Sequence, residues 1–558
     1  MDHHFATVWE SVADEMGTET AIVHGAVRRS WSDLDDRASR LAGAFVAAGL
    51  HPGSKVAQYL YNAPEYLEVH FAALKLRAVP VNVNYRYLDE ELLYLLTDSE
   101  AEVLVYHRSL GERVARVGGR APRLRLLIEV DDEGSPTAEP LVPGAVPYEV
   151  VVSGHDPMPR ISRPPDDITM TYTGGTTGMP KGVISPVGPS VDGVMAAAPP
   201  IIGEPAVTDP ADVAPAARRY TDSGRRIIAL PACPLMHATG LSIGAVPALL
   251  FGGCVVLLTG RALDVDEAWS AVERERVVSL TIVGDAFARP LLRGLVDGPE
   301  RDLSSLSLIC SSGAMFSTEV KQGLLDRLGR TVIVDFIAST EATMGTSIAT
   351  REHPAVTGHF FPSPGVKVFD EHDREVLAGS GTSGFVAVPG AIQLGYFHDQ
   401  AKTDKTFRVI DGVRYAIPGD WATVGADGSL TLLGRGSQCI NTGGEKVFSE
   451  EVEEAVKRHP AVEDCLVFGV PDERFGQRVA AVVSLTHPAG EGGTPPVEAA
   501  TIVDSLRSEL SSYKLPRDVV LVDEVPRAPN GKADYPSARR LLAATSEEHP
   551  SGPSGAPT

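Results

Sequence analysis

The segment TYTGGTTGMPKG, residues 171–182, is the most informative part of the sequence. Its glycines let the backbone approach a bulky anion, its threonine hydroxyls can donate hydrogen bonds, and Lys181 adds a positive charge. The lysine lies between a proline and a glycine, which differs from the Walker arrangement, in which Gly-Lys precedes Ser or Thr. We interpret the segment as a phosphate-binding loop. Composition alone leaves a flexible glycine–threonine turn as the alternative.

The composition predicts several structural units and excludes two classes of partner. The chain has 558 residues, which is too long for one ordinary hydrophobic core. Lysine and arginine number 50 against 73 acidic residues, a net charge of −23. Such a surface repels nucleic acid and anionic lipid, so we expect neither as a partner. An anionic ligand must therefore enter a local positive pocket.

The cysteines and the N-terminus predict a reduced, cytoplasmic compartment. Five cysteines, an odd count without any CxxC pair, argue against a disulfide framework or a structural zinc site. The first residues are polar and do not predict a signal peptide. Between His237 and Arg261 no residue is charged, but Pro247 and several glycines interrupt this segment. We therefore expect a buried helix, a turn and a strand at 254–258 rather than a membrane span.

Most of the chain alternates helical and strand-like patterns, which predicts an α/β fold with mostly parallel sheets. Helices are expected at 31–50 and 65–76, and strands at 55–61, 78–83, 227–230, 280–283, 306–310 and 332–336. Residues 185–219 are rich in Pro and Ala with little periodicity, and we expect a surface excursion there.

The last 120 or so residues predict a small α+β unit. Helices are expected at 449–459 and 502–511, and strands at 465–470, 479–485 and 519–522. Glycines on both sides of Arg435 predict a joint at 434–437. The expected organisation is a large N-terminal domain of several subdomains at 1–434, a small mobile C-terminal domain at 435–544, and a disordered tail at 545–558.

Several short motifs follow one another in an order typical of one superfamily. They are Trp31-Ser32-Asp33-Leu34, Pro234-Leu235-Met236-His237-Ala238-Thr239-Gly240, Ser312-Gly313-Ala314-Met315, Ser339-Thr340-Glu341, Tyr415-Ala416-Ile417-Pro418-Gly419-Asp420, Gly434-Arg435 and Pro529-Asn530-Gly531-Lys532. Together with the loop at 171–182, they make the chain resemble the adenylate-forming superfamily: acyl-CoA synthetases, peptide-synthetase adenylation domains and beetle luciferases. Each motif is weak alone, but their joint order extends over nearly the whole chain.

The resemblance implies an enzyme that uses ATP, Mg²⁺, a small carboxylic acid and coenzyme A. It assigns the nucleotide to Thr173, Gly174, Gly175, Thr176, Thr177 and Lys181 at the phosphates, Gly313, Ala314 and Asp335 at adenine, and Asp420 and Arg435 at ribose. Glu341, with Thr173, would hold Mg²⁺, which prefers oxygen ligands. Asp420 suits a vicinal diol because its carboxylate accepts two hydrogen bonds.

The resemblance also implies the catalytic and acyl sites. Lys532 would bridge the carboxylate and the α-phosphate, Thr340 would donate to that phosphate, and His237 would gate the acyl pocket. The acyl pocket is assigned to His237, Thr239, Gly240, Gly284 and Asp285, the hinge to Gly436 and Ser437, and the pantetheine thiol to Gly443 and Gly444. Small residues in this set leave volume for a bulky acyl group.

Without the resemblance, each of these residues has a common structural interpretation that involves no ligand. A Thr-Glu pair is typical of a helix start, a Gly-Asp pair of a turn, a lone histidine of a structural role and a lone loop lysine of an exposed surface.

Two departures from the superfamily pattern refine the expectation. Ile337-Ala338 replaces the usual Tyr-Gly, so no aromatic ring stacks on adenine, and Ser437 replaces the usual hinge Asp or Lys. These features resemble the actinobacterial branch that activates steroid side-chain acids and other polycyclic acids. Amino-acid activation is disfavoured, because no carboxylate follows His237 to bind a substrate amine.

Three hypotheses follow. The first is a complete acid–thiol ligase. The second is an enzyme that only adenylates and passes the acyl group to a separate ligase or carrier protein. The third is a nucleotide-binding protein without catalysis, which the joint presence of Lys181, Glu341, Asp420, Arg435 and Lys532 disfavours. The resemblance also leaves a homodimer open.

Overall fold

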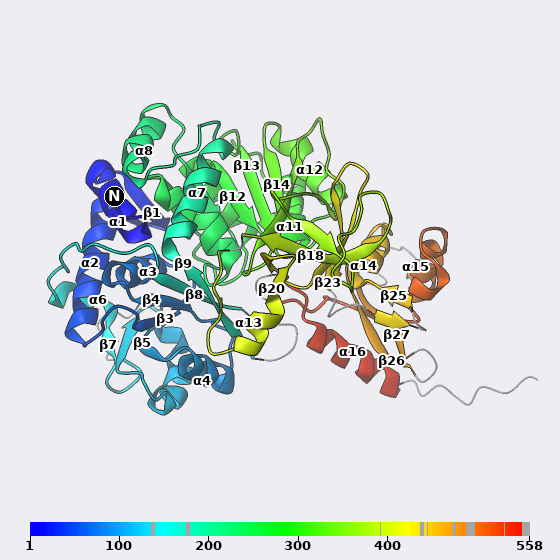
Figure 1. Cartoon of the computed structure of the whole chain (residues 1–558), viewed down its shortest axis with the longest axis horizontal. Coiled ribbons are helices and arrows are strands. Elements are labelled where there is room, and N and C mark those ends of the chain that lie inside the picture. The colour runs from blue at the N-terminus through cyan, green and yellow to red at the C-terminus, as the bar shows by residue number, and fades with distance from the viewer. Residues whose placement is uncertain are drawn as a thin grey trace, which may run out of the picture.

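The computed structural model describes residues 1–134, 140–173, 179–390, 392–435, 440–442, 445–472, 476–486, 497–528 and 531–548. Within these residues, the strands form three β-sheets covered by helices. Figure 1 shows the N-terminal helices at one end of the long axis and the strands of the third sheet at the other. The expected α/β class with mostly parallel sheets in the large N-terminal part and a small C-terminal unit is confirmed.

The first sheet is mostly parallel, in the order β19-β9-β8-β4-β3-β5-β6-β7. Its strands are β3 (Lys55–Tyr59), β4 (Val79–Asn82), β5 (Ala101–His107), β6 (Leu126–Val130), β7 (Val146–Pro147), β8 (Ile168–Thr173), β9 (Lys181–Pro186) and β19 (Gly395–Tyr396). Only the β8–β9 and β9–β19 pairs of this sheet are antiparallel. Associated helices are α2 (Trp31–Ala47), α3 (Pro64–Leu76), α4 (Asp89–Asp98), α5 (Gly111–Val117) and α6 (Tyr148–Gly154).

Helix α2 begins where the sequence indicates. Ser30 caps it, its hydroxyl accepting from the Asp33 backbone N–H while the Asp33 carboxylate accepts from the Ser30 backbone. Leu34 and Phe45 lie on its buried face. The buried Trp31 donates its ring N–H to the Gly253 carbonyl, which ties the first sheet's helices to the second sheet.

The second sheet has a parallel centre, β1-β11-β10-β12-β13-β14, and antiparallel strands on both sides. Its strands are β1 (Thr20–His24), β2 (Val27–Ser30), β10 (Ile228–Pro231), β11 (Cys254–Leu257), β12 (Ser279–Ile282), β13 (Leu308–Ser312), β14 (Val332–Ala338), β15 (Thr343–Ala349), β16 (His359–Pro362), β17 (Lys367–Phe369), β18 (Ser383–Pro389), β20 (Phe407–Ile410), β21 (Val413–Ala416), β22 (Asp420–Val424) and β23 (Leu430–Arg435).

Helices accompany this sheet along most of its length. They are α1 (Phe5–Met16), α7 (Val187–Ile201), α8 (Val213–Asp222), a π-helix η4 (Thr239–Ala245), α9 (Val246–Leu250), α10 (Val265–Glu275), α11 (Gly284–Asp297), α12 (Thr318–Leu328) and α13 (Gln400–Thr406). The uncharged segment expected to be buried forms η4, α9 and β11. No helix in the described part of the chain has the length and apolarity needed to cross a membrane.

The third sheet takes all its strands from residue 440 onward. They are β24 (Ile440–Thr442), β25 (Glu445–Val447), β26 (Val462–Asp472), β27 (Gly476–Leu485) and β28 (Asp518–Val522), with helices α14 (Ser449–Lys457), α15 (Ala499–Ser505) and α16 (Tyr535–Glu548). Among the described residues of this sheet, only the β27–β28 pair is parallel. The predicted helix, two strands, helix and strand are present in that order as α14, β26, β27, α15 and β28, whereas β24, β25 and α16 were not predicted.

Two expectations about the fold are wrong. Residues 185–219 are not a surface excursion, because α7 and α8 occupy much of that region and Val187, Val191 and Met195 are buried at a spacing of four. Their helical period is masked in the sequence by the surrounding small residues and prolines. The tail does not begin at 545, because α16 continues to Glu548. Its Leu and Ala residues favour a helix, and Leu542 packs against the third sheet.

Candidate active site

Three of the predicted site residues lie at the carboxyl ends of three adjacent parallel strands. Gly284 follows β12, Gly313 follows β13 and Glu341 follows β14, and these strands are neighbours in the second sheet. Parallel strands that end side by side place their following loops together, and ligands of α/β sheets bind at such an edge.

Lys532 reaches this edge from the C-terminal unit. Gly313 has a left-handed backbone with φ of +93°, and a Cβ atom added to it would lie 3.5 Å from Lys532 Cε and 3.8 Å from Thr239 Oγ1. The loop before Lys532 rests on helix α11, since a Cβ on Gly531 would lie 2.9 Å from Ala286 Cβ. The structure therefore brings Lys532, Gly313 and Thr239 together.

His237 lies beside Lys532 as a neutral imidazole. Burial, with a smaller effect of the positive charge of Lys532 in the same direction, lowers its pKa to about 3. Its Nε2 atom is buried and has no hydrogen-bond partner in the part of the chain that the structure describes. His237 therefore adds no charge near an incoming carboxylate at neutral pH.

An ionic cluster of buried Lys457 and half-buried Asp464 and Arg527 holds the Lys532 loop in shape. Arg527 donates from Nη1 to the Gly531 carbonyl at 2.9 Å and from Nη2 to Asp464 Oδ1 at 2.8 Å. Lys457 lies 2.7 Å from the same carboxylate. Burial alone would raise the pKa of Asp464, but Lys457 and Arg527 outweigh it and hold that pKa well below its usual range. Asp464 therefore stays charged.

Glu341 lies in the tight connection between β14 and β15, not at a helix start. The Ser339 hydroxyl accepts hydrogen bonds from the backbone N–H groups of Glu341 (3.2 Å) and Ala342 (3.3 Å), which shapes the turn. The Tyr396 hydroxyl donates to Glu341 Oε1. Thr340, next to it, is half-buried.

Lys181 and Thr173 flank the predicted phosphate loop. They face each other at the end of the β8–β9 ladder, and Lys181 Nζ lies 3.3 Å from Asp399. Burial lowers the pKa of Lys181, but hydrogen bonds to Tyr94 and Asp399 outweigh it and raise the pKa overall. The loop residues Gly174, Gly175, Thr176 and Thr177 lie outside the described residues.

Asp420 and Arg435 are partners across the β22–β23 ladder, and Asp420 is buried. The register places two residues assigned to ribose directly opposite each other. The predicted hinge residues Gly436 and Ser437 and the thiol-site residues Gly443 and Gly444 lie outside the described residues.

Asp335 is buried on β14, and its carboxylate accepts from Lys321 Nζ at 2.8 Å. Burial raises the pKa of Asp335, against the opposing effect of Lys321. An ion pair therefore already occupies one oxygen of the residue assigned to the adenine amine, and that role remains a prediction. Ala314 lies next to Gly313, with its carbonyl toward Gly284.

Gly240 and Gly284 lie where segments of the chain cross closely, and their place in the acyl pocket remains a prediction. A Cβ on Gly240 would lie 2.3 Å from the Pro234 carbonyl oxygen, and one on Gly284 would lie 2.2 Å from the Met315 carbonyl oxygen. Backbone fills both spaces, so these glycines allow segments of chain to cross closely. Thr239 keeps its place beside Gly313.

The carboxylate of Asp285, also assigned to the acyl pocket, has protein hydrogen-bond partners on both oxygens. Its Oδ1 accepts from the Ser317 backbone N–H at 2.9 Å and from the Ser317 hydroxyl at 3.1 Å, and Oδ2 accepts from Arg289 at 3.0 Å. The carboxylate thus fixes the loop between β13 and α12, and its role in the acyl pocket remains a prediction.

The donors present fit a magnesium ion carried by a nucleotide. No group of three or more His, Cys, Asp or Glu side chains is placed to hold a metal among the residues that the structure describes. Mg²⁺ is commonly held by one or two carboxylates together with substrate phosphates, so a single glutamate suffices. Tyr396 engages one oxygen of Glu341 and leaves Oε2 for such an ion.

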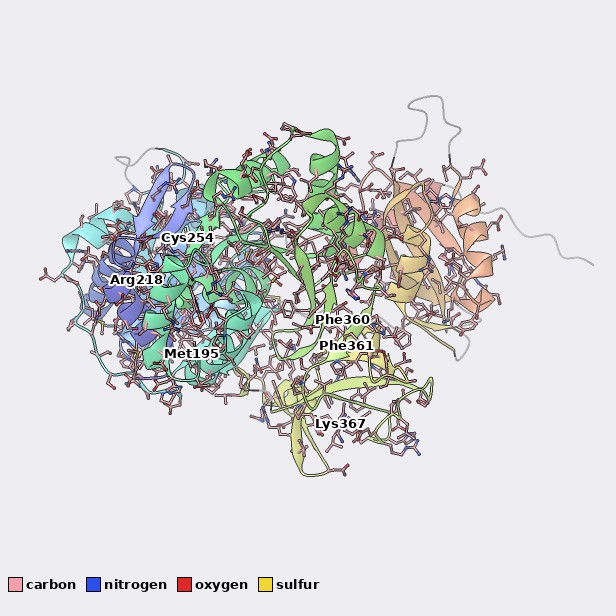
Figure 2. The ribbon with its side chains drawn as sticks, turned by 90° about the horizontal axis from the view of Figure 1, so that it is seen from above. Met195, Arg218, Cys254, Phe360, Phe361 and Lys367 are labelled. Carbon is pink, nitrogen blue, oxygen red and sulfur yellow. The ribbon has the colours of Figure 1, made fainter. Side chains whose placement is uncertain are left out.

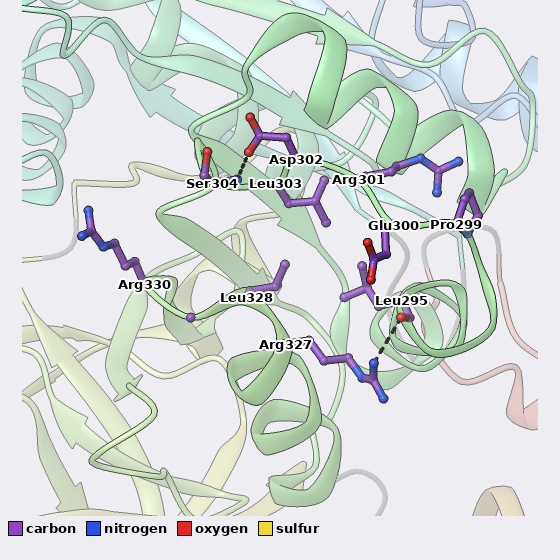
Figure 3. A pocket seen from close by; sticks show the side chains of 11 residues that line it. Leu295, Pro299, Glu300, Arg301, Asp302, Leu303, Ser304, Arg327, Leu328 and Arg330 are labelled. Atoms are coloured by element: carbon purple, nitrogen blue, oxygen red, sulfur yellow. Dashed lines mark hydrogen bonds between the residues drawn. The ribbon is translucent and has the colours of Figure 1, made fainter.

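The larger surface hollow lies away from this site. It has a volume of about 700 Å³. It is lined by Leu295, Pro299, Glu300, Arg301, Asp302, Leu303, Ser304, Arg327, Leu328, Gly329 and Arg330 (Figure 3). Its loops precede β13 and β14, so it lies at the amino ends of the strands. A smaller hollow of about 50 Å³ includes Pro234 and Phe287 and lies closer to the candidate site.

The sequence motifs missed Tyr396, Asp399 and Arg527. The one available signal was Gly395-Tyr396 followed by Asp399 three residues before Lys402, a spacing typical of a helix N-cap.

Comparison with known families and relatives covers nearly the whole chain. The family described as AMP-binding enzyme matches residues 9–397, and its C-terminal domain matches residues 451–532. A Mycolicibacterium smegmatis protein named medium/long-chain-fatty-acid–CoA/3-oxocholest-4-en-26-oate–CoA ligase is 39% identical, over 98% of this chain and 97% of its own. A Rhodococcus rhodochrous 3-oxocholest-4-en-26-oate–CoA ligase is 37% identical, over 95% and 94%.

Solved structures share the fold. An anthranilate CoA ligase, AuaEII, in complex with anthranoyl-AMP, superposes with a TM-score of 0.81 at 22% identity, covering 98% of both chains. A benzoate CoA ligase from Burkholderia xenovorans LB400 gives a TM-score of 0.78 at 21% identity, covering 96% of this chain and 99% of its own. The family match over residues 9–397 and 451–532, together with the relative that is 39% identical, shows that the chain belongs to the AMP-binding enzyme family.

Proposed function

We propose that this chain activates a bulky carboxylic acid, of steroid or diterpenoid type, and transfers it to coenzyme A. The AMP-forming acid–thiol ligase class rests on the family and on the relatives named above. The bulky acid is the finer part of the proposal, supported by the names of the steroid-acid ligases. The observation that carries the proposal is Lys532 packed against Gly313 beside His237.

In the first step, a carboxylate oxygen attacks the α-phosphorus of ATP, and pyrophosphate leaves. Both reactants are anions, so their repulsion is a large part of the barrier. Lys532 supplies a positive charge at this edge of the sheet, and neutral His237 lines the approach without binding the acid as an ion pair. Lys181 neutralises phosphate charge. Mg²⁺ bound to ATP shields the phosphates and would be held by Glu341.

In the second step, the thiol sulfur of coenzyme A attacks the acyl carbonyl carbon. AMP leaves, and the thiol proton passes to solvent. Lys532 occupies the space in front of Gly313, so it has to withdraw before a pantetheine arm can enter. We propose that the unit after residue 434 rotates for this purpose, about Gly436 and Ser437, and presents Gly443 and Gly444.

A second candidate keeps the first step only and passes the acyl group to a carrier or a separate ligase. Ser437, in place of the usual hinge residue, is the observation that favours it.

Product analysis by mass spectrometry tests both candidates. The protein is incubated with Mg²⁺, ATP and linear fatty acids, aryl acids, steroid side-chain acids or diterpenoid acids, each with and without coenzyme A. We expect acyl-CoA and AMP from the polycyclic acids. Acyl-CoA from linear acids alone would contradict the bulky substrate, and acyl-AMP that persists with coenzyme A would favour the second candidate.

A further inference from the structure

Tyr396 holds the carboxylate assigned to the magnesium ion. It is 6% exposed, and its hydroxyl donates to Glu341 Oε1. A neutral donor leaves the carboxylate charge in place, because the tyrosine does not compensate it as an arginine would. The bond also restricts rotation of the Glu341 side chain and leaves Oε2 as the oxygen that a cation can use.

The same short segment holds the lysine of the phosphate loop. Tyr396 on β19 pairs with Val183 on β9, the strand that begins at Lys181. Three residues after Tyr396, the Asp399 carboxylate lies 3.3 Å from Lys181 Nζ. One turn of chain therefore contacts both groups that face the phosphates, although Lys181 and Glu341 lie far apart in the sequence.

Internal hydrogen bonds make this segment, residues 395–403, a fixed turn. Asp399 caps helix α13 by accepting from the Lys402 backbone N–H at 2.9 Å. The Thr403 hydroxyl accepts from the Tyr396 backbone N–H at 2.9 Å and donates to the Asp399 carbonyl at 2.8 Å. The distance between the Tyr396 and Asp399 side chains is thus set by the turn itself.

We propose that the 395–403 segment positions the nucleotide, with Tyr396 aiming Glu341 at the metal-bound phosphates and Asp399 aiming Lys181 at the same group. The inference rests on the proposed use of ATP. Tyr396 and Asp399 are positioning residues, since they act through Glu341 and Lys181. A carboxylate and an ammonium whose positions are fixed before the polyphosphate binds lower the cost of ordering it.

The chain offers a matched control for the tyrosine. Tyr106, fully buried on β5, donates its hydroxyl to Glu129 Oε2 at 3.0 Å, in the first sheet and without a contact to the candidate site. Tyr106→Phe and Tyr396→Phe each remove one hydroxyl bonded to a carboxylate. A merely structural role for Tyr396 predicts the same behaviour for both variants.

Calorimetric titration of ATP without any acid substrate, with and without Mg²⁺, tests the proposal. We expect Tyr396→Phe to weaken ATP binding about 10-fold with Mg²⁺, to require more Mg²⁺ for half-maximal binding, and to leave binding without Mg²⁺ unchanged. Asp399→Asn keeps the helix cap, and we expect it to weaken ATP binding under both conditions. Tyr106→Phe should bind ATP as the wild type does.

The proposal would be overturned if Tyr396→Phe had the ATP affinity and the Mg²⁺ requirement of the wild type. It would also be overturned if Tyr106→Phe lost as much ATP affinity as Tyr396→Phe. Melting temperatures of all variants separate lost binding from lost folding. If Tyr396→Phe does not fold, Asp399→Asn decides the question, since wild-type affinity there would overturn it. A wild type that binds MgATP but makes no acyl-AMP or acyl-CoA would contradict the proposed function and not this inference.

Discussion

Lys532 is the residue on which the two proposed half-reactions differ most. It lies against Gly313 in this structure, and we propose that it leaves before coenzyme A arrives. We expect Lys532→Ala to lower the rate of acyl-AMP formation at least 100-fold, because the reacting anions lose their bridging charge. Thioester formation from supplied acyl-AMP should change less than about threefold. Pyrophosphate release and acyl-CoA formation, measured separately, check this.

Lys367→Ala is the control for that variant. Lys367 is a half-buried lysine paired with Glu375, and Figure 2 shows it on a lobe apart from the C-terminal unit. The Lys367→Ala variant should leave the rates of both half-reactions unchanged. An equal loss of both half-reactions in Lys532→Ala would contradict the rotation.

Gly240 and Gly193 differ in whether the structure has room for a side chain at the glycine. A Cβ on Gly240 would collide with the Pro234 carbonyl, whereas a Cβ on Gly193 in α7 meets nothing within 4 Å. We expect Gly240→Ala to lower the free energy of unfolding by about 2 kcal/mol or more and to displace His237. Gly193→Ala should raise it by about 0.5–1 kcal/mol, because alanine favours a helix. Urea denaturation of both variants measures the difference, and a neutral Gly240→Ala would contradict the close crossing.

At the scale of elements, the loop that carries Lys532 depends on Arg527. Arg527→Lys keeps a charge beside Asp464 but loses the planar fork that also reaches the Gly531 carbonyl. We expect acyl-AMP formation to slow about 10-fold, which corresponds to one lost hydrogen bond. Thioester formation from supplied acyl-AMP should be unchanged.

Arg458→Lys is the control in the same unit, because Arg458 lies on the surface with Glu454 and Glu509. It should leave both rates at wild-type values. If Arg527→Lys adenylates as fast as Arg458→Lys, the ionic cluster does not support Lys532.

Elements with a clear period were predictable, and elements without one were not. Leu34, Leu41 and Phe45 recur at helical spacing, and helix α2 occupies the expected region. Helix α7 was missed because Val187, Val191 and Met195 stand among small residues and prolines, so no polar face marks the helical period. The periodicity of apolar residues predicts a helix only where polar residues occupy its exposed face.

The candidate site, too, was predictable from the sequence only in part. Lys532, Gly313 and Thr239 were predicted from motifs, and the structure brings them together. The bond from Tyr396 to Glu341 was not predicted, because it joins residues 55 positions apart through the pairing of β19 with β9. Pairwise contacts of that kind depend on tertiary register, which spacing along one chain does not contain.

For the whole molecule, buried histidines make stability depend on pH. Burial lowers the pKa of His70 to about 4 and that of His107 to about 4. An unfolded histidine has a pKa near 6.5, so the unfolded chain binds more protons below that pH, and stability falls as pH falls from about 6.5 toward 4. Glu65, whose pKa burial and Glu68 raise to about 7, acts in the opposite direction between pH 4.5 and 7.

A single variant isolates one of these groups. His70→Gln removes one titrating site, and we expect its stability to fall by about 2 kcal/mol less than that of the wild type between pH 7 and pH 5. Chemical denaturation at both pH values, in wild type and variant, measures this. Parallel pH dependence of the two proteins would show that His70 does not titrate on unfolding.

The crossings at Gly240 and Gly284 also bear on how such an enzyme could acquire new substrates. In the sequence these positions look like free room, open to mutation during divergence or directed evolution. In the folded protein each one is occupied by a neighbouring carbonyl, so any larger residue is selected against before it meets a substrate. Thr239, with a side chain that reaches the site edge, is free of that restriction. Changes in acid preference along a lineage should therefore accumulate at positions such as Thr239, while both glycines persist.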